Sequence, residues 1–364
     1  MIGLVESLLR PMLRMLDAED AHRFVIHTLR FPPFVKLVAD DPRLAVRALG
    51  LDFPNPIGMA AGFDKHGEVP DALLKLGFGF VEIGTVTPKP QFGNPRPRVF
   101  RLPRDMGVIN RLGFNSQGGD AVLRRVVARA TQSGIVGANI GANKESPDRV
   151  ADYVRLIEMF APAVSYFCVN ISSPNTPGLR ELQQARMLDE LLPRVMDARE
   201  RAGREAATRP VLLKIAPDLT LRELDDIVGA TRRHRVDGMI IGNTTVMRPP
   251  TMRDKRTARE AGGLSGRPLF ALATRMLAET YIRVEGALPL VGVGGIDSGE
   301  TALAKIKAGA TLIQIYSALV FHGLPLIARI KSDLSNTLRR GRHAGIQELV
   351  GTDAAAITKQ AWPA

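Results

Sequence analysis

The chain has 364 residues, 45% hydrophobic and 24% charged, which is typical of a soluble globular protein with a sizeable buried core. One cysteine excludes a disulfide framework, and the six histidines show no metal-ligand spacing, so no metal site is expected. The net charge of +12 is spread along the chain without a nucleic-acid-binding motif, so we expect no nucleic-acid partner and favour anionic substrates, cofactors or membrane surfaces.

The first 31 residues predict two short amphipathic helices. Apolar side chains recur at helical spacing over residues 4–16, but charged residues and a proline interrupt them, so this stretch is neither a membrane span nor a signal peptide. Asp17 is expected to cap a second helix, which ends before the prolines at 32–33. On the residues alone, two alternatives stay open: these helices lie on a membrane surface, or they pack on the main domain.

From residue 50 onward, short apolar runs alternate with amphipathic helical patterns. Eight buried strands are predicted, at 56–61, 78–84, 135–140, 164–169, 211–216, 237–242, 288–293 and 311–316. Helices are predicted between most of them, at 120–130, 149–160, 182–203, 220–233, 267–280 and 299–308. The count favours a (β/α)8 TIM barrel. A doubly wound sheet is the alternative, but it predicts G-x-G-x-x-G after the first strand, where the chain has AAGFDKHG.

Three segments follow from this pattern. Residues 1–40 form an N-terminal helical extension, residues 41–340 the barrel, and residues 341–364 a last helix and a fraying end. About 50 residues separate the second and third strands, long enough for extra strands or a lid.

Polar or glycine residues stand at the end of every predicted strand. The fourth strand, which contains Cys168 as a buried core residue, is followed by Asn170, Ser172, Ser173 and Asn175. The other strand ends carry Ala61, Gly62, Asp64 and Lys65; Gly84 and Thr85; Asn139; Lys214; Asn243 and Thr244; Gly294 and Gly295; and Tyr316 and Ser317. Active sites of barrels lie at the carboxyl ends of the strands, so we expect a functional site there rather than ordinary turns.

The residue types indicate a class of chemistry. The GVGG run at 292–295 suits a phosphate group, because glycine lets backbone N–H groups approach an anion. Lys65 suits a carboxylate, and Lys214 suits an anion that develops on a cofactor. Neither a His–Asp pair nor paired carboxylates appear at these strand ends, which argues against triad and glycosidase chemistry.

Amides and one hydroxyl complete this set. Asn110, Asn170, Asn175 and Asn243 supply both donors and acceptors, the mixture that a pyrimidine-like ring needs. Ser173 is the candidate proton acceptor, although a serine needs activation by its surroundings, and the alternative is that its hydroxyl only closes a turn before Pro174.

Six motifs resemble those of the dihydroorotate dehydrogenase family. They are AAGFDK at 60–65, GNPRPRVFRLP at 93–103, INRLGFN at 109–115, NISSPNT at 170–176, GGLSGRP at 262–268 and GVGGI at 292–296. The similarity covers about residues 5–335 and is greatest to the membrane-associated, quinone-reducing class 2 branch, which has serine at the base position and an N-terminal helical extension. It implies a barrel that holds FMN and oxidises dihydroorotate to orotate in pyrimidine biosynthesis.

The resemblance also assigns residues. Ser173 would take the C5 proton of the substrate while a hydride leaves C6, and Lys214 would support the charge that builds on the cofactor. Contacts with FMN are implied for Ala61, Gly62, Phe63, Asp64, Lys65, Thr85, Asn139, Asn170, Lys214, Gly242, Gly266, Gly295, Tyr316 and Ser317. Contacts with the substrate are implied for Lys65, Asn110, Arg111, Leu112, Gly113, Phe114, Asn170, Asn175, Asn243 and Thr244.

The resemblance to the class 2 branch also implies a function for the N-terminal segment. Two helices of that branch form an apolar mouth for the quinone, and His22, Arg101 and Tyr316 match positions near the quinone head. We therefore expect a peripheral protein on the cytoplasmic side of the cell inner membrane. The alternatives are the same fold and substrate with a soluble acceptor such as fumarate or NAD, and a non-enzymatic peripheral membrane adaptor.

One position departs from the family pattern. Gly242 stands where Ser or Thr is frequent. If the residue contacts FMN through its backbone, nothing changes; if the contact needs a hydroxyl, one hydrogen bond of roughly 0.5–1.5 kcal/mol is missing.

Overall fold

Eight parallel strands close into a barrel, as the sequence predicts. The computed structural model describes residues 13, 15–31, 39–129, 131–205 and 208–363. The strands are β3 (Ile57–Met59), β4 (Phe80–Val86), β7 (Ile135–Ile140), β8 (Tyr166–Asn170), β9 (Val211–Ile215), β10 (Gly238–Ile241), β12 (Leu290–Val293) and β13 (Leu312–Ile315). Around the barrel their order is β10-β12-β13-β3-β4-β7-β8-β9. Each coincides with a predicted apolar run to within two residues, because strands buried on both faces are apolar throughout.

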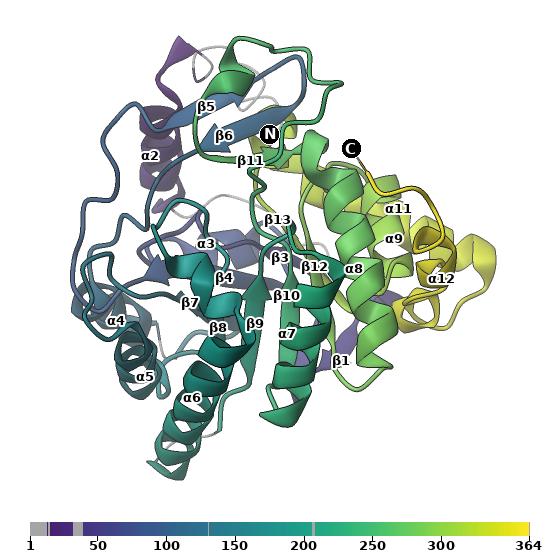
Figure 1. Ribbon diagram of the computed structural model, residues 1–364. Coiled ribbons are helices and arrows are strands. Elements are labelled where there is room, and N and C mark those ends of the chain that lie inside the picture. The colour runs from purple at the N-terminus through teal and green to yellow at the C-terminus, as the bar shows by residue number, and fades with distance from the viewer. Residues whose placement is uncertain (1–12, 14, 32–38, 130, 206–207, 364) are drawn as a thin grey trace.

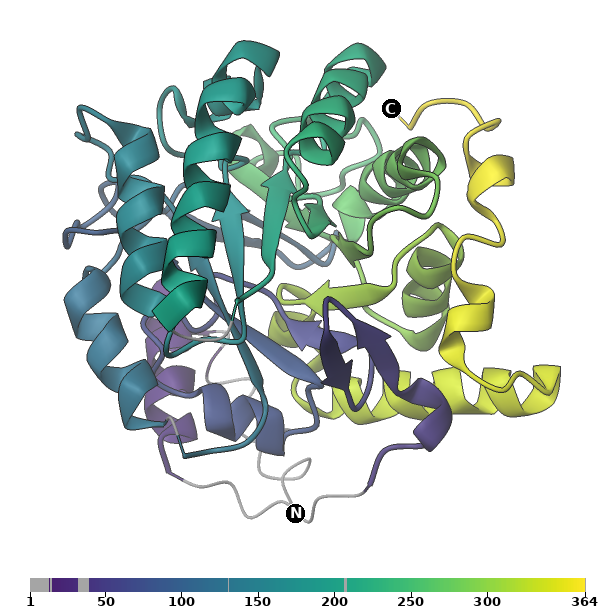
Figure 2. The ribbon, with the colours of Figure 1, turned by 90° about the horizontal axis from the view of Figure 1, so that it is seen from below.

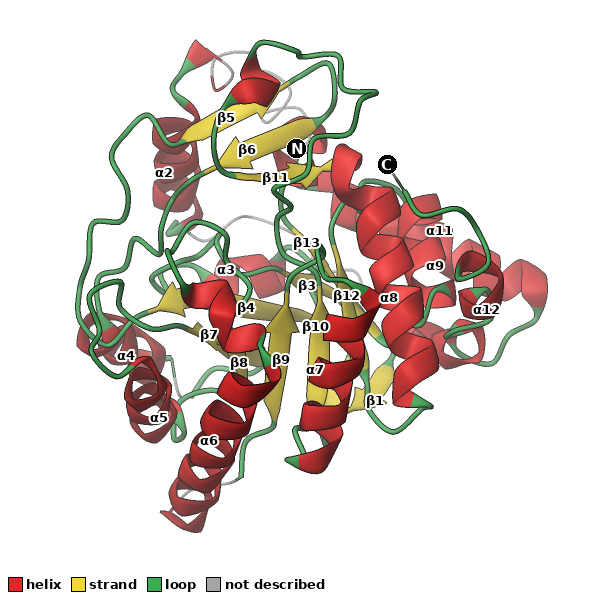
Figure 3. Ribbon diagram, in the orientation of Figure 1, coloured by secondary structure: helices red, strands yellow, loops and turns green. Residues whose placement is uncertain are grey.

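Helices surround the barrel on its outside (Figures 1 and 3). They are α3 (Pro70–Lys75), α4 (Gly119–Ala128), α5 (Arg149–Phe160), α6 (Ala185–Glu205), α7 (Leu221–Arg233), α8 (Phe270–Val284), α9 (Gly299–Lys307), α10 (Ala318–His322) and α11 (Pro325–Gly341). Short 3-10 helices span Pro42–Leu44 (η1), Leu179–Gln183 (η2), Thr257–Arg259 (η3), Arg267–Leu269 (η4) and Ile346–Leu349 (η5). All six predicted helices are present. Helix α7, for example, begins with a capping box formed by Thr220 and Glu223.

A hairpin covers the amino ends of the barrel strands. It consists of β1 (Val46–Ala48) and β2 (Leu51–Phe53), which pair antiparallel (Figure 2). Phe53 meets Phe80, at the start of β4, edge to face with 5.3 Å between ring centroids. This end of the barrel is therefore packed shut, which leaves the carboxyl ends for a site.

A small antiparallel sheet stands over the carboxyl ends (Figure 1). It pairs β5 (Val99–Leu102), β6 (Gly107–Asn110) and β11 (Gly263–Gly266) in the order β11-β6-β5. Leu102, Ile109, Met252 and Leu264 form a buried cluster of their own, separate from the core of the barrel. Two of its strands occupy the long connection between the second and third barrel strands, where extra strands or a lid were expected.

Helix α2 (Ala18–Leu29) packs against β5 at the edge of this sheet. Asp17 is its N-cap, as predicted, and accepts hydrogen bonds from the backbone N–H groups of Glu19 and Asp20. Most of the first predicted helix, and the prolines at 32–33, lie outside the described residues. Within the described part of the chain, no helix combines the length and apolarity needed to cross a bilayer.

The C-terminal segment, residues 341–364, contains a short last helix, as the sequence predicts. Helix α11 already ends at Gly341, and η5 and α12 (Ala354–Ile357) follow it. The buried Arg275 of α8 donates hydrogen bonds to the carbonyl groups of Ile357, Thr358 and Gln360. Because a buried guanidinium needs acceptors, this residue fixes the tail against the barrel.

Candidate active site

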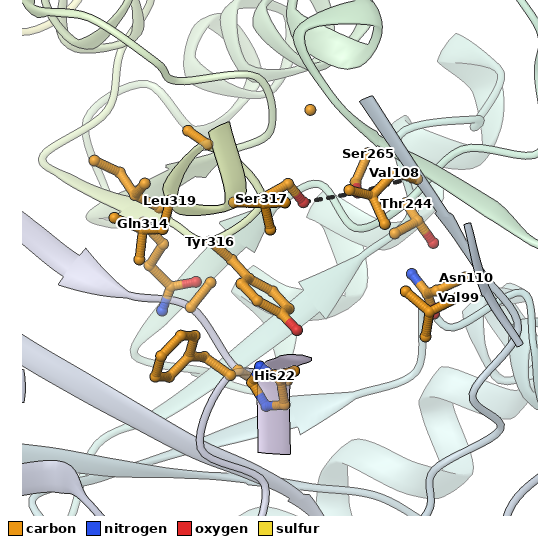
Figure 4. A pocket seen from close by; sticks show the side chains of 18 of the residues that line it. His22, Val99, Val108, Asn110, Thr244, Ser265, Gln314, Tyr316, Ser317 and Leu319 are labelled. Atoms are coloured by element: carbon orange, nitrogen blue, oxygen red, sulfur yellow. Dashed lines mark hydrogen bonds between the residues drawn. The ribbon is translucent and has the colours of Figure 1, made fainter. Parts of the chain in front are cut away.

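A cavity of about 650 Å³ lies between the carboxyl ends of the barrel strands, the small sheet and α2. In Figure 4, Gln314, Tyr316 and His22 occupy one side, and Asn110 and Thr244 the other. One end is polar and formed by strand ends, whereas the other is apolar and formed largely by α2 and α10. A cavity of this size, lined by both polar and apolar side chains, suits small-molecule ligands.

Most of the predicted site residues line this cavity together. They are Ala61, Gly62, Phe63, Lys65, Thr85, Asn110, Leu112, Gly113, Phe114, Asn170, Ser173, Asn175, Lys214, Gly242, Asn243, Thr244, Gly266, Gly295, Tyr316 and Ser317, with His22 and Arg101 at the apolar end. The barrel thus brings residues from seven of its eight strand ends to one place; β7 is the exception.

Three predicted residues do not line it. Asp64 is buried and accepts hydrogen bonds from the backbone N–H groups of Glu68 and Val69 at the start of α3. Arg111 points outward, where it contacts Glu260 at 2.8 Å and lies over the Phe100 ring. The side chains of both residues therefore bind other parts of the protein rather than the cavity.

Asn139, the third of them, lies beneath the cavity floor. Its Oδ1 accepts hydrogen bonds from Thr85 Oγ1 at 2.6 Å and from Asn170 Nδ2 at 3.0 Å. The pairing of β4 with β7 shifts between Ile83 and Val86, so Thr85 stands in an irregularity of the strand. Asn139 therefore supports two lining side chains without lining the cavity itself.

The floor continues as a chain of hydrogen bonds toward Asn243. Asn170 Oδ1 accepts from Ser172 Oγ at 2.9 Å, and Ser172 Oγ accepts from Asn243 Nδ2 at 2.8 Å. Nearby, Asn175 Nδ2 donates to Asn110 Oδ1 at 3.2 Å, which brings two more predicted amides together. The cluster of four asparagines expected from sequence is thus present.

Ser173 faces the cavity and is buried. Its Oγ accepts a hydrogen bond from the backbone N–H of Asn175 at 3.3 Å. Within the described residues, no histidine or carboxylate is hydrogen-bonded to this hydroxyl, so the site contains no serine triad.

Two lysines place positive charge at the polar end. Lys65 Nζ donates to the carbonyl of Gly62 at 2.7 Å, and burial lowers the pKa of Lys65 to about 8. Lys214 Nζ lies 3.8 Å from the buried carboxylate of Glu82. Lys214 is buried and Lys65 is half-buried, which strengthens their attraction for an anionic ligand.

Close-packed glycines and hydroxyls form a cradle between β11, β12 and α8. A Cβ at Gly295, whose φ is +76°, would lie 2.5 Å from Phe270 Cβ and 2.8 Å from Phe270 N, so only glycine fits there. Ser265 Oγ and Ser317 Oγ are 2.8 Å apart (Figure 4). Backbone N–H groups near a helix start suit a phosphate, as predicted for the GVGG run.

Gly242, the departure noted in the sequence, has φ +111°. This is a conformation that side-chain-bearing residues rarely adopt, so the local backbone itself favours glycine. Its place in the lining leaves only backbone atoms to meet a ligand.

Aromatic rings form the wall next to α2. His22 packs edge to face on Phe63 at 5.1 Å, and Tyr316 packs on the same ring at 5.8 Å. Burial lowers the pKa of His22 to about 3, so the ring is neutral at pH 7. Arg101 donates to the carbonyl groups of Leu13 and Leu16, which ties β5 to the chain just before α2.

Sequence reasoning missed Glu82, Gln314 and Ser265. Glu82 and Gln314 are buried polar residues inside the otherwise apolar β4 and β13. A charged or amide residue within a buried strand was the signal that could have identified them. Ser265 belongs to a motif that the sequence singled out, but no role was given to its hydroxyl.

Comparisons with known proteins agree on one family. The model of the family described as dihydroorotate dehydrogenase matches residues 43–338. A dihydroorotate dehydrogenase (quinone) from Bradyrhizobium diazoefficiens is 65% identical over 363 residues, and one from Rhodopseudomonas palustris strain HaA2 is 64% identical, with 100% of both chains covered in each case. The crystal structure of DHODH in complex with ferulenol from Eimeria tenella superposes with a TM-score of 0.88 at 37% identity, over 93% of this chain and 96% of that one.

Proposed function

The chain belongs to the dihydroorotate dehydrogenase family, and from that premise we propose that it oxidises (S)-dihydroorotate to orotate with FMN as cofactor and a quinone as electron acceptor. This reaction is the fourth step of de novo pyrimidine biosynthesis. The observation that supports it best is the cavity at the carboxyl ends of the strands, which joins a polar pocket with serine, asparagines and lysines to an apolar passage beside α2.

The residues of this chain fit FMN. Gln314 Oε1 and Thr244 Oγ1 are buried and lack a hydrogen-bond partner among the described residues, so they offer polar atoms to a bound ligand. The cradle at Gly295 and Gly266 suits the phosphate group, and Lys214 suits the ring system. Bound FMN would supply the two-electron chemistry, accepting a hydride from the substrate and passing the electrons to quinone.

The protein's own groups handle the substrate and its proton. The ammonium of Lys65 suits the carboxylate of dihydroorotate, and the amides of Asn110, Asn175 and Asn243 suit its ring N–H and C=O groups. Ser173 Oγ takes the C5 proton. The backbone N–H of Asn175 holds this hydroxyl in place.

The apolar end suits the quinone. His22, Tyr316 and Arg101 lie where the polar pocket meets the passage beside α2. Met15 and Phe31, at the two ends of the described N-terminal segment, are 87% and 67% exposed. Exposed apolar side chains on either side of an amphipathic helix suit insertion into a bilayer surface. The N-terminal helices would then bind the cytoplasmic side of the inner membrane peripherally and collect quinone from it.

An acceptor comparison tests this proposal. Purified protein reduced by dihydroorotate is mixed in turn with a short-chain ubiquinone, fumarate and NAD, and the return of the oxidised flavin absorbance is followed. Rapid reoxidation by quinone alone is expected. Reoxidation by fumarate or NAD at a comparable rate would instead assign a soluble acceptor and leave α2 without a role in acceptor binding.

A further inference from the structure

Glu82 is a fully buried carboxylate near the centre of the barrel, on β4, and four other strands supply its partners. Its Oε1 accepts a hydrogen bond from Asn139 Nδ2 at 2.8 Å and lies 3.8 Å from Lys214 Nζ. Its Oε2 accepts from Tyr166 Oη at 3.1 Å and from Gln314 Nε2 at 2.9 Å. Both oxygens of this carboxylate therefore have polar partners.

Stability does not account for this arrangement. Barrel interiors are normally filled by Val, Ile and Leu, and a buried ion pair is often no more stabilising than apolar residues of the same volume. Two of the four partners, Lys214 and Gln314, line the cavity, and a third, Asn139, supports its floor. The carboxylate thus stands directly behind the ligand site.

A carboxylate accepts hydrogen bonds and donates none, so it fixes how the neighbouring amides are turned. Gln314 has to direct Nε2 toward Glu82, which leaves Oε1, without a partner among the described residues, as an acceptor for a ligand. Asn139 has to direct Nδ2 the same way, which leaves Oδ1 to accept from Thr85 and Asn170.

The hydrogen bonds keep the same donor-to-acceptor direction as far as the substrate side of the cavity. Asn170 Nδ2 donates to Thr85 Oγ1, and Asn170 Oδ1 is left to accept from Ser172 Oγ. Ser172 in turn accepts from Asn243. Every donor in this chain points toward Glu82. Successive hydrogen bonds in such a chain strengthen one another in a low-dielectric interior, so a change at one end affects the bonds at the other end.

We infer that Glu82 is a positioning residue, which acts through Lys214, Gln314 and Asn139 to set the charge and the hydrogen-bond direction of the cavity floor. The inference rests on the proposed function, in which FMN lies against this floor. The carboxylate of Glu82, 3.8 Å from Lys214 Nζ, balances the charge of that lysine. Without this carboxylate, the uncompensated ammonium favours the electron-rich, reduced cofactor.

The test replaces Glu82 by Gln, which keeps the shape and removes the charge. We expect the equilibrium constant for two-electron reduction of bound FMN to rise at least tenfold, an increase in midpoint potential of about 30 mV. We also expect the dissociation constant of FMN, measured by quenching of its fluorescence on addition to apoprotein, to rise. Glu82→Asp keeps the charge and should hold the potential close to that of the wild type.

Glu279→Gln is the matched control, because Glu279 is a buried carboxylate paired with Arg275 and Arg283 on α8, away from the cavity. This control variant should change neither the midpoint potential of bound FMN nor the dissociation constant of FMN. A folded Glu82→Gln variant with the wild-type potential and affinity would overturn the inference, and so would equal shifts in Glu82→Asp and Glu82→Gln, which would indicate packing alone.

Removing one charge from a buried pair can prevent folding. If Glu82→Gln does not fold, Glu82→Asp decides the question, since its shorter side chain loosens the contacts but keeps the charge. Weaker FMN binding at an unchanged potential supports the inference, and unchanged binding overturns it. Wild-type protein that binds no FMN would overturn the proposed function, and the inference with it.

Discussion

Glu19 of α2 and Arg98, which precedes β5, form a two-pronged ion pair: Arg98 Nε donates to Oε2 at 2.9 Å and Nη2 donates to Oε1 at 2.8 Å. Arg96 adds a third contact to Glu19 at 3.1 Å. Although burial alone would raise it, the pKa of Glu19 falls to about 2 because of the two guanidinium groups. Charge-assisted, bidentate pairs of this kind are the strong ones. They fix α2 over the mouth of the cavity.

Glu19→Gln should therefore loosen α2 without disturbing the polar pocket. A hydrogen bond to a charged group contributes about 1.5–3 kcal/mol, so the equilibrium constant for docking of α2 should fall by about tenfold or more. We expect turnover with quinone to fall and turnover with a soluble dye acceptor to be retained.

The control for this variant is Glu285→Gln, because Glu285 forms an exposed pair with Arg232 at 3.2 Å and exposed pairs contribute little. It should leave both activities unchanged. Equal losses of quinone and dye turnover in Glu19→Gln would show that α2 serves the whole site rather than acceptor access.

Ser173→Ala should slow reduction of the flavin by dihydroorotate by roughly 10²–10⁴-fold, the usual contribution of a general base. Reoxidation by quinone should stay at the wild-type rate, since the hydroxyl has no part in it. Stopped-flow absorbance measures the two half-reactions separately. If both slowed to the same extent, Ser173 would not be the proton acceptor.

The affinity for orotate should depend on pH through Lys65. Burial lowers the pKa of this lysine to about 8, so the ammonium that attracts the ligand carboxylate is present below pH 8 and is lost as pH rises through it. The dissociation constant of orotate should be constant below about pH 7 and should rise by up to about tenfold per unit above pH 8. Titrations monitored by flavin absorbance check this.

Lys65→Arg provides the comparison, because arginine stays charged throughout this range. Its orotate affinity should be weaker but independent of pH. A wild-type dissociation constant that stays flat to pH 9.5 would remove Lys65 from carboxylate recognition.

Gly295→Ala should prevent tight FMN binding. The added methyl group would lie 2.5 Å from Phe270 Cβ, so the cradle would have to open. Gly286→Ala is matched in backbone conformation, with φ +74° against +76°, but its added methyl group meets nothing within 4 Å. FMN affinity should fall at least tenfold in the first variant only. Equal losses would point to backbone strain and not to the cradle.

The sequence was sufficient for the barrel and for the position of the site. The alternation of apolar runs with amphipathic helices is a local signal, and the carboxyl ends of parallel strands meet at one edge. The direction in which an individual side chain points could not be predicted from these local patterns. Arg111 turns away because Glu260, far along the chain, offers it a carboxylate. Asn139 lies below Thr85, at a place where the pairing of β4 with β7 is irregular.

Long-range partners also explain the other differences. The role of Glu82 depends on residues from four other strands, which no local pattern brings together. The ordered C-terminal segment depends on Arg275, whose need for acceptors becomes apparent only once it is known to be buried. Pairings between distant residues are set by the whole fold, not by the segment that contains either partner.

Anaerobic addition of L-dihydroorotate to the purified protein tests the central claim most directly. The oxidised flavin absorbance should disappear rapidly and stoichiometrically, because the cavity would place FMN, Ser173 and the substrate-binding amides together. Bound flavin that stays oxidised in the presence of dihydroorotate would contradict the assignment of the substrate, and folded protein that cannot bind FMN would contradict the enzymatic function as a whole.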